Sequence, residues 1–259
     1  MSETLRSVCS GRVLRLELNR PDKRNALNLE LCDALVTALD AAEEDPTVGA
    51  ILLTGNGKSF CAGMDLHEIS AANQDATGEV HERLFTAGWR LTKPLVAAVH
   101  GAALAGGTGL VANCHVVVAS PDATFGLTEI RIGLWPFLVF RAVTTALGER
   151  RTLELALTGR IFGASEAREL GLIVEIADDV VARGLEIAAR LAEASPTAIR
   201  AGLRCVQESR GKDWRQAGEI ARKMRLAVFE TADFQEGIRA FREKRQPRWP
   251  SILRMEDPI

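Results

Sequence analysis

The stretch of residues 94–119 limits the possible folds more than any other part of this chain. An apolar, alanine-rich run over 94–100 is followed by small residues over 101–109, and then by the apolar runs 110–114 and 115–119. By the usual lengths of such elements, this pattern predicts a buried strand, a glycine-rich turn, a short helix and a second buried strand within about 25 residues. Strands joined by short helices are typical of α/β proteins.

The N-terminal part predicts the same alternation. Residues 12–18 alternate apolar and polar side chains as a strand does, and residues 48–53 form a short apolar run typical of a second strand. Between them, apolar residues recur at helical spacing over 29–44, and Asn28 is placed to cap that helix. We therefore expect a strand, a helix and a strand in this part of the chain.

Beyond the first two strands, helices become more frequent. A loop over residues 55–65 leads into a short helical segment, and a longer helix is expected around 79–91. After Pro136 the pattern is mostly helical, with a brief strand near 171–176. From Val180 onward it is almost wholly helical.

The clearest joint in the chain is Ser195-Pro196-Thr197. We expect residues 1–195 to form the body of the protein and residues 196–259 to form a C-terminal helical region. This region is rich in Arg and Glu with Leu and Phe interleaved, so it cannot bury its apolar stripes alone. It must pack on the body or on another subunit.

Charge and cysteine content exclude several classes of protein. The 32 basic and 34 acidic residues nearly balance, so the chain lacks the positive potential that attracts nucleic acids or anionic membranes. The five cysteines show no C-x-x-C spacing, which favours reduced thiols. We find neither a signal-peptide pattern nor an apolar run of membrane-spanning length. These features predict a soluble cytoplasmic protein without nucleic-acid or membrane partners.

Catalytic groups are scarce, because the chain contains no tyrosine and only four histidines. Two segments, 61–65 and 104–109, combine a strand end, a turn of small residues and a following helix, which leaves backbone N–H groups unpaired. Two such amides converging on one oxygen would hold an enolate or a tetrahedral oxyanion without any side chain. When each turn is considered alone, its small residues have another interpretation, which is that they let a helix pack closely on a sheet.

Glu129 is the candidate acid–base residue to complement those amides. Apolar neighbours, among them Leu127 and Ile130, can form a pocket that raises the pKa of this carboxyl group. The alternative is a solvated glutamate paired with Arg131, and the local sequence leaves both interpretations open. Four further residues are candidates for an apolar wall of the same site or for the core: Leu134, Trp135, Phe137 and Leu138.

Several motifs together resemble the enoyl-CoA hydratase/isomerase, or crotonase, superfamily. They are S-F-C-A-G-M-D-L at 59–66, V-A-A-V-H-G-A-A-L-A-G-G-T-G-L at 96–110, F-G-L-T-E-I-R-I-G-L at 125–134 and L-T-G-R-I-F-G-A-S-E-A at 157–167. The segment E-G-I-R-A-F-R-E-K-R at 236–245 is similar to the C-terminal signature of that family. The resemblance implies an α/β crotonase-like (ClpP/crotonase) spiral of ββα units. It also implies that the helical C-terminal region trimerises, commonly into a dimer of trimers.

The resemblance implies roles for individual residues as well. The oxyanion hole of the family takes one backbone N–H from the position of Met64 and one from that of Gly106, and it holds the thioester carbonyl of an acyl-CoA. A proton at the α-carbon is then moved by Glu129 through a stabilised enolate. CoA is part of the substrate, so neither a metal nor a separate cofactor is implied. Further residues match the CoA-binding segments of the family: Lys23, Arg24, Ala26, Ala62, Asp65, Leu66 and Lys244. For the three cations among them, ordinary surface charge is the alternative.

The chain departs from the family pattern at Gly109. Typical hydratases carry one glutamate there and another at the position of Glu129, so that one handles the nucleophilic water and the other the α-proton. With one carboxylate, three functions stay open. The first is an enoyl-CoA hydratase of fatty acid metabolism, because hydratases are the more numerous members. The second is a Δ3,Δ2-enoyl-CoA isomerase with Glu129 as sole base. The third is a catalytically silent acyl-CoA-binding protein. The sequence leaves the acyl chain undetermined.

Other chemistries are weaker interpretations of the same residues. The segment 107–112 matches G-x-G-x-x-A of dinucleotide-binding folds, but only about two helical turns fit before the next strand. Cys61 with His67 has no third group to orient a thiol nucleophile, so a buried inert thiol is expected. The histidines show no zinc pattern, and His115 is expected to be a satisfied core residue.

Overall fold

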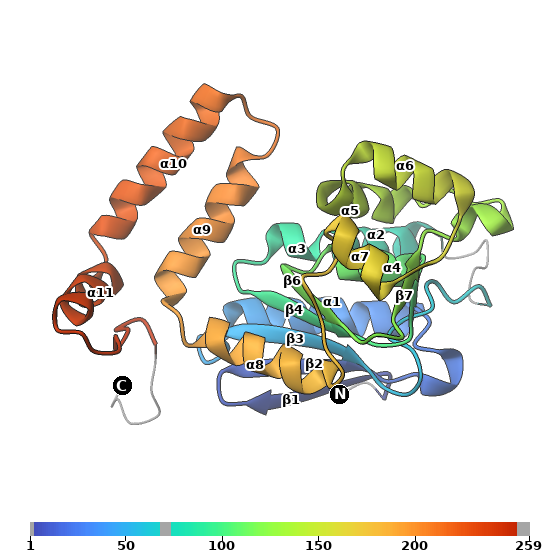
Figure 1. The fold of residues 1–259 in the computed structure, drawn as a ribbon, viewed down its shortest axis with the longest axis horizontal. Helices are drawn as coiled ribbons and strands as arrows, with labels where there is room; N and C mark the ends of the chain where they lie inside the picture. The colour runs from blue at the N-terminus through green and yellow to red at the C-terminus, as the bar shows by residue number, and fades with distance from the viewer. Residues whose placement is uncertain (1–2, 68–73, 253–259) are drawn as a thin grey trace.

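The computed structural model describes residues 3–67 and 74–252, and a six-stranded sheet forms the centre of the body (Figure 1). The first pair of strands is antiparallel, and every later pair of neighbours in this sheet is parallel. Across the sheet the strands are β1 (Leu5–Ser10), β2 (Val13–Leu18), β3 (Ala50–Gly55), β4 (Leu95–Val99), β6 (Val116–Ala119) and β9 (Glu175–Ile176).

A second, smaller sheet carries the segments that build the candidate site. It consists of β5 (Ala102–Leu104), β7 (Thr124–Gly126) and β8 (Phe162–Gly163). Strand β5 runs directly into the short helix α4 (Gly106–Ala112), and β7 precedes the single 3₁₀ turn η3 (Glu129–Ile132). Because β5 and β7 are parallel neighbours, the start of α4 and the segment of Glu129 leave this sheet at the same edge.

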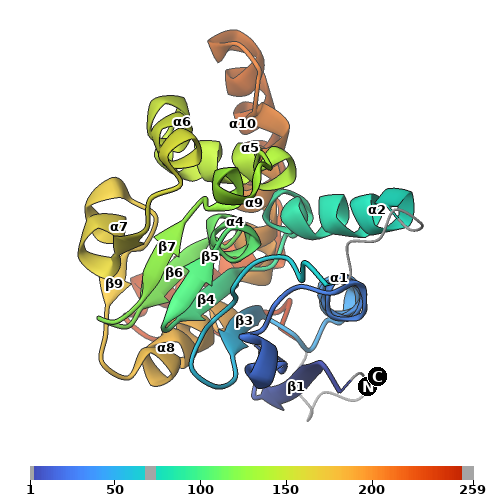
Figure 2. The same ribbon diagram turned by 90° about the vertical axis from the view of Figure 1, so that its right-hand side faces the viewer.

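Helices bury both faces of the main sheet. Helix α8 (Val180–Ala192) packs on one face, where Ala188 contacts a cluster that includes Leu52 and Ala98. Helices α1 (Leu29–Glu44) and α2 (Gln74–Phe85) contribute to the larger cluster on the other face. Figure 2 shows α8 and α4 on opposite sides of the sheet. Burial on both faces explains why the parallel strands are nearly continuous apolar runs.

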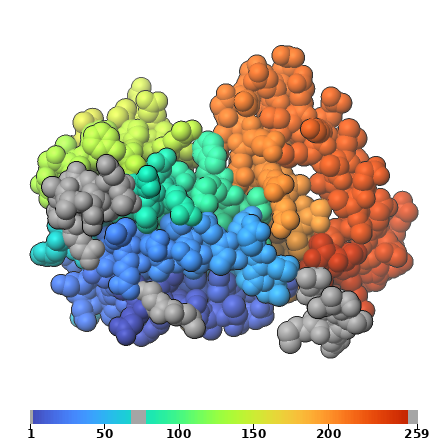
Figure 3. Space-filling view, turned by 180° about the vertical axis from the view of Figure 1, so that it is seen from behind, coloured from blue at the N-terminus to red at the C-terminus, as the bar shows by residue number. Residues whose placement is uncertain are grey.

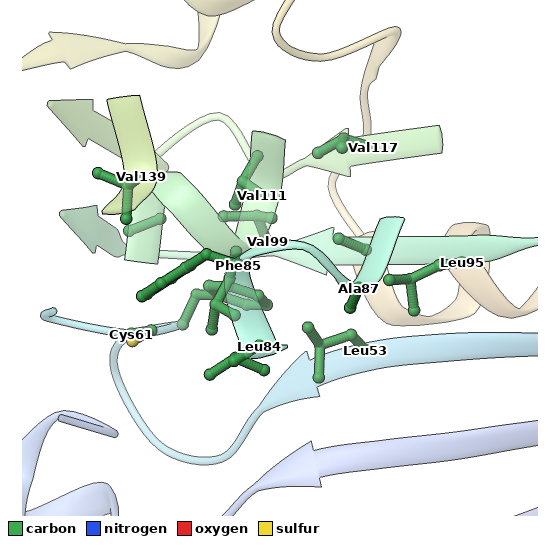
Figure 4. Close-up of a cluster of buried hydrophobic side chains, with 14 of the residues drawn as sticks. Leu53, Cys61, Leu84, Phe85, Ala87, Leu95, Val99, Val111, Val117 and Val139 are labelled. Carbon is green, nitrogen blue, oxygen red and sulfur yellow. The ribbon is translucent and has the colours of Figure 1, made fainter. Parts of the chain in front are cut away.

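The larger cluster connects the sheet to the helices around the candidate site. In Figure 4, Leu53 and Val99 come from the sheet, Phe85 from α2, Val111 from α4, and Val139 from the following helix α5. The remaining helices of the body are α3 (Ala87–Arg90), α5 (Phe137–Leu147), α6 (Glu149–Thr158) and α7 (Ala164–Leu170), with the 3₁₀ turn η1 (Pro21–Lys23) near the N-terminus.

Three further helices form a lobe beside the body, as Figures 1 and 3 show. They are α9 (Pro196–Ser209), α10 (Trp214–Phe229) and α11 (Ala232–Arg242). Ser195 caps α9 by accepting a hydrogen bond from the Ala198 N–H, and its hydroxyl also donates to Asp233 on α11 at 2.5 Å. Large apolar side chains stay exposed on this lobe, including Trp214 at 96%. The division into two regions at residue 195 stays a prediction.

Local expectations from the sequence compare well with these elements. Asn28 caps α1, since its side chain accepts a hydrogen bond from the Leu31 N–H at 3.1 Å. Strand β1 was missed because it is an edge strand of which only Leu5 is buried, so it lacks an apolar pattern. Helix α4 begins at Gly106 rather than at residue 110, because its first turn consists of small residues with weak helical preference.

The helix expected around 79–91 is two helices, since α2 ends at Phe85 and α3 follows it. Most of the short helical segment expected after residue 65 lies outside the described residues. Within the described part of the chain, no helix has the length and apolar character needed to cross a membrane.

Candidate active site

A cavity of about 320 Å³ lies among the start of α4, the inner face of α2, η3 and the start of α5. Its walls are mostly apolar, and the four bulky residues between Leu134 and Leu138 named above all line it. Met64 and Gly106 line it as well. Among its described lining residues, His81 and Glu129 are the only ones with ionisable side chains. The cavity thus brings together the residues expected to perform chemistry.

Met64 presents the first unpaired amide. It lies in an extended segment beside Leu27, whose N–H donates to the Gly63 carbonyl at 2.8 Å and whose carbonyl accepts from the Asp65 N–H at 2.9 Å. Successive N–H groups of an extended chain point in opposite directions, so the Met64 N–H points away from Leu27. It has no acceptor among the described residues. This amide is therefore free to bind a ligand.

Gly106 presents the second amide, because it is the first residue of α4 and its N–H has no intrahelical partner. The preceding residue, Ala105, has φ +50° and ψ −118°, which is a strained conformation for a residue with a side chain. A hydrogen bond of 2.8 Å from the Ala105 N–H to the Gly126 carbonyl holds that turn in place. The strained turn sets the direction in which α4 begins.

Gly63 allows the two amide segments to approach each other. Its φ is +97°, and a Cβ placed on it would lie 2.9 Å from the Cβ of Ala105 and 3.0 Å from the Leu104 carbonyl oxygen. A side chain is therefore excluded by both conformation and space. The glycine keeps Met64 and Gly106 at the same wall of the cavity.

Glu129 is the carboxylate of the site. Its side chain is only 9% exposed, and its Oε2 is buried without a hydrogen-bond partner among the described residues. Burial raises the pKa of Glu129, although a hydrogen bond from its own backbone N–H acts in the opposite direction. No ion pair joins it to Arg131 in the described structure. The apolar-pocket interpretation is confirmed, and the solvated-glutamate alternative is wrong.

Position 109 has no room for a second carboxylate. Gly109 lies inside α4, where α5 packs against it, and a Cβ placed there would lie 2.4 Å from Cγ1 and 2.7 Å from Cβ of Val139. Real Cβ atoms do not approach other atoms so closely. Val139 therefore occupies the space that a side chain at position 109 would need.

The loop of Lys23 and Arg24 lies next to the cavity wall. The Ala62 N–H donates to the Arg24 carbonyl at 3.0 Å, and both cations are exposed at the tip of this loop while Ala26 is half-buried. Asn25, which sequence reasoning missed, is fully buried and holds the loop. Its Nδ2 donates to the Asn56 and Ser59 carbonyls at 2.9 and 2.8 Å. Its φ is +54°, a conformation that asparagine tolerates well. No motif in the sequence marks this residue.

Asp65 is buried, and its carboxylate is already occupied. Its Oδ2 forms an ion pair with Nη2 of Arg20 at 2.9 Å, and its Oδ1 accepts a hydrogen bond from the His67 N–H at 3.2 Å. Burial alone would raise the pKa of Asp65, but the hydrogen bonds from Arg20 and His67 prevail and lower it. The side chain thus holds the loop that carries Met64.

Arg20→Met is expected to destabilise the protein by about 3–5 kcal/mol at neutral pH, because it leaves Asp65 as a buried charge without a partner. Urea unfolding followed by circular dichroism measures the loss, with Arg150→Met on the exposed surface of α6 as the control. The difference in stability between wild type and Arg20→Met should shrink below about pH 3.9, where unfolded aspartate becomes protonated, since a neutral Asp65 needs no cation. If Arg20→Met were as stable as Arg150→Met at pH 7, this would contradict the structural role of the ion pair between Arg20 and Asp65.

Of the remaining predicted site residues, Leu66 and Ala62 line the cavity and Lys244 does not. Leu66 lines the mouth of the cavity and is 51% exposed, and Ala62 lines the wall. Lys244 follows α11 in the C-terminal lobe, apart from α4 in the body (Figure 1), and it is not among the residues that line the cavity. A single chain therefore brings together all predicted site residues except Lys244.

The weaker interpretations find no support in the geometry. Burial raises the pKa of the Cys61 thiol to about 12, as expected for an inert thiol. Both ring nitrogens of His115 are satisfied, as predicted, because Nδ1 accepts from the Leu95 N–H at 2.9 Å and Nε2 lies 3.2 Å from the Gly88 carbonyl, but the residue is half-buried rather than part of the core. No group of three or more metal-ligating side chains occurs among residues 3–67 and 74–252. Helix α4, with seven residues, is too short for a dinucleotide-binding crossover.

Comparison with known proteins adds independent evidence. The model of a protein family described as enoyl-CoA hydratase/isomerase matches residues 9–252. A Mycobacterium tuberculosis protein named enoyl-CoA hydratase is 37% identical over 252 residues, which cover 92% of this chain and 93% of that protein. The 2,3-dehydroadipyl-CoA hydratase of Escherichia coli is 35% identical over 91% of this chain and 94% of its own length.

Solved structures show the same fold. The crystal structure of an enoyl-CoA hydratase from Mycobacterium smegmatis superimposes with a TM-score of 0.90 and 30% identity over 96% of this chain and 99% of that chain. An enoyl-CoA hydratase/isomerase from Legionella pneumophila, described as a crotonase, superimposes with a TM-score of 0.88 at 28% identity over 95% of this chain and 99% of that one. The expected crotonase-like α/β fold is confirmed.

Proposed function

The chain belongs to the enoyl-CoA hydratase/isomerase family, and from this premise we propose that it adds water to the double bond of a 2-enoyl-CoA thioester. One observation carries the proposal. The two unpaired amides of Met64 and Gly106 and the buried carboxyl group of Glu129 line a single apolar cavity. This is the set of groups that chemistry through a thioester enolate requires.

The amides act as an oxyanion hole. The thioester oxygen accepts hydrogen bonds from the N–H groups of Met64 and Gly106, which stabilise the negative charge that develops when water attacks C3. The walls of the cavity are mostly apolar, so these hydrogen bonds act in a medium of lower polarity than water. The enolate therefore forms at a lower cost than it would in water.

Glu129 supplies the acid–base function at C2. Burial raises its pKa and so favours the protonated carboxyl group, which delivers its hydrogen to C2 of the enolate. In total the reaction adds one water molecule to the double bond, as a hydroxyl group on C3 and a hydrogen on C2. No metal or redox cofactor takes part, since CoA arrives as part of the substrate.

The CoA moiety lies along the loops beside the cavity in this proposal. Lys23 and Arg24 offer cations to its phosphates, because both are exposed next to the segment of Ala62. Ala26 and Leu66 flank the path from this loop to the thioester. Asp65 contributes by holding that segment through Arg20.

We also propose that the protein is a homo-oligomer, a trimer or a dimer of trimers, in the cytoplasm. Trp214 and Phe241 on the C-terminal lobe are 96% and 84% exposed, as expected of side chains that another copy covers. The five free cysteines fit a reducing compartment. Lys244 follows α11 of the C-terminal lobe and does not line the cavity of its own chain, so in this proposal it reaches bound CoA from a second copy.

Lys244→Ala is therefore expected to weaken CoA binding about fivefold, the effect of losing one partly solvated contact between a cation and a phosphate. Isothermal titration of the oligomer with CoA measures the affinity, and Lys212→Ala in the exposed α9–α10 loop is the control. Unchanged affinity in Lys244→Ala oligomers would argue that this lysine is ordinary surface charge.

Two substrates test the proposed function directly. Purified protein is offered crotonyl-CoA, a 2-enoyl-CoA, and separately a 3-enoyl-CoA, and the products are separated by chromatography. Formation of the 3-hydroxyacyl-CoA supports the hydratase. The isomerase stays a second candidate because Val139 fills the position of the second carboxylate, and it would only move the double bond of the 3-enoyl-CoA. A protein that binds CoA but converts neither substrate would be the silent acyl-CoA binder.

A further inference from the structure

Hydration requires two proton transfers, one from the attacking water and one to C2, whereas the described residues that line the cavity include a single carboxyl group. We propose that His81 is the second proton-handling group and takes the proton of the water that attacks C3. The inference rests on the proposed hydratase function. It assigns a catalytic role to a residue that lies outside the family motifs in the sequence.

The position of His81 is the first observation. It lies on α2, is only 6% exposed and lines the same cavity as Glu129. Its Nε2 is buried and has no hydrogen-bond partner in the described structure. A buried polar atom without a partner loses its hydration and gains nothing in return, so native proteins rarely contain one without a reason. A water molecule or substrate in the cavity would provide the partner.

The packing around position 109 is the second observation. A Cβ placed on Gly109 would lie 3.1 Å from Cε1 of Phe85, and the Phe85 ring lies 6.2 Å from the His81 ring, centroid to centroid. His81 and Phe85 are one helical turn apart, so they lie on the same face of α2. That face of α2 therefore places an imidazole beside the region from which a carboxylate at position 109 is missing.

The protonation state of His81 suits a base. Burial lowers its pKa, so the imidazole is neutral at neutral pH, and in the tautomer with its hydrogen on Nδ1 the Nε2 lone pair can accept a proton. Burial lowers the pKa of His115 as well, but both ring nitrogens of His115 are bonded to the backbone. Of these two histidines, His81 alone has a free ring nitrogen and faces the cavity.

The proton balance of the proposed step closes within the cavity. Water forms a bond from its oxygen to C3, one O–H bond breaks, and the proton passes to Nε2 of His81. The π electrons of the C2–C3 bond move into the enolate, which the Met64 and Gly106 amides hold. Protonated Glu129 then gives its proton to C2. Return of the proton from the imidazolium to the Glu129 carboxylate, through water after product leaves, restores both groups.

The test separates the two proton transfers. Hydration of crotonyl-CoA is compared with exchange of the α-hydrogen of butyryl-CoA in D₂O, which needs only the amides and Glu129. His81→Gln is expected to lower kcat of hydration about 100-fold, the usual contribution of a general base, while exchange stays within about twofold of wild type. Added imidazole should restore part of the hydration activity of His81→Ala, in which space for the free base is opened.

His100→Gln is the matched control, since the His100 ring bonds only the Gly57 carbonyl at 2.9 Å and lies away from the cavity lining. CoA titration confirms that each variant is folded. Undiminished hydration by His81→Gln would overturn the inference, as would an equal fall of hydration and exchange, which indicates a merely structural residue. If wild type exchanges the α-hydrogen but never hydrates crotonyl-CoA, the proposed hydratase function itself fails, and this inference falls with it.

Discussion

Glu129→Gln is expected to lower kcat for hydration of crotonyl-CoA by about 10³-fold, with KM nearly unchanged. The amide side chain keeps the size of the carboxyl group but cannot give or take the proton at C2. Binding is retained because the Met64 and Gly106 amides and the CoA loop are unaltered. Initial rates over a range of crotonyl-CoA concentrations measure both constants. Wild-type turnover by this variant would show that another group moves the α-proton.

The same substitution is expected to stabilise the fold, which is an independent check on the environment of Glu129. Burial raises the pKa of this carboxyl group in the folded state, so the unfolded chain ionises at lower pH than the native protein. The stability of wild type therefore falls as pH rises from about 4.3, the ordinary pKa of glutamate, to the higher folded pKa. The variant lacks this loss, because glutamine does not ionise.

Urea unfolding of wild type and Glu129→Gln at pH 4 and pH 8 measures that difference. The advantage of the variant should be small at pH 4 and largest at pH 8. Glu44→Gln, at an exposed position near the end of α1, is the control and should show no such gain. If Glu129→Gln were less stable than wild type at pH 8, the carboxylate would have a stabilising partner that does not occur among the described residues. The expected gain in stability of Glu129→Gln would mean that function is maintained at the expense of stability, as often occurs in active sites.

Gly109→Glu, which would restore the usual pair of carboxylates, is expected to destabilise the protein by roughly 3 kcal/mol and to leave hydration no faster. The new Cβ would lie 2.4 Å from Cγ1 of Val139, so α4 and α5 would have to separate. The carboxylate would also enter an apolar region beside Phe85 without a cation to pair with. Urea unfolding and crotonyl-CoA hydration measure the two effects.

A double variant separates the steric from the electrostatic cause. Adding Val139→Ala to Gly109→Glu removes the atom nearest to the new Cβ, so part of the lost stability should return. Val139→Ala alone is the control, and it should cost about 2 kcal/mol or more for the cavity that it leaves. A Gly109→Glu protein of native stability and increased kcat would mean that α5 yields easily at this contact.

Some residues of the site could be predicted from the sequence because their roles depend on the backbone. The unpaired amides of Met64 and Gly106 arise from turns of small residues, whose spacing is visible in the sequence. His81 could not be predicted in this way, because its segment carries no recognisable motif. Its place in the cavity depends on the packing of α2 against α4, which joins segments distant in the chain.

Paired polar groups were equally invisible in the sequence. Arg20 and Asp65 are separated by 45 positions, yet they form the ion pair that holds the Met64 segment. Asn25 bonds carbonyls more than thirty residues away. Local spacing contains no information about such partners, since a polar side chain finds them only after the backbone has brought the segments together.

The sequence by itself determined several strands and helices of the body, the cap of α1 and the turns that expose two amides, because these depend on neighbours a few residues away. Only the tertiary structure decided that Glu129 is buried rather than solvated, that Val139 fills the space beside Gly109, and that Lys244 does not line the cavity of its own chain. Burial, electrostatic environment and free space are properties of the whole packed chain, and they govern the pKa values on which the proposed chemistry depends.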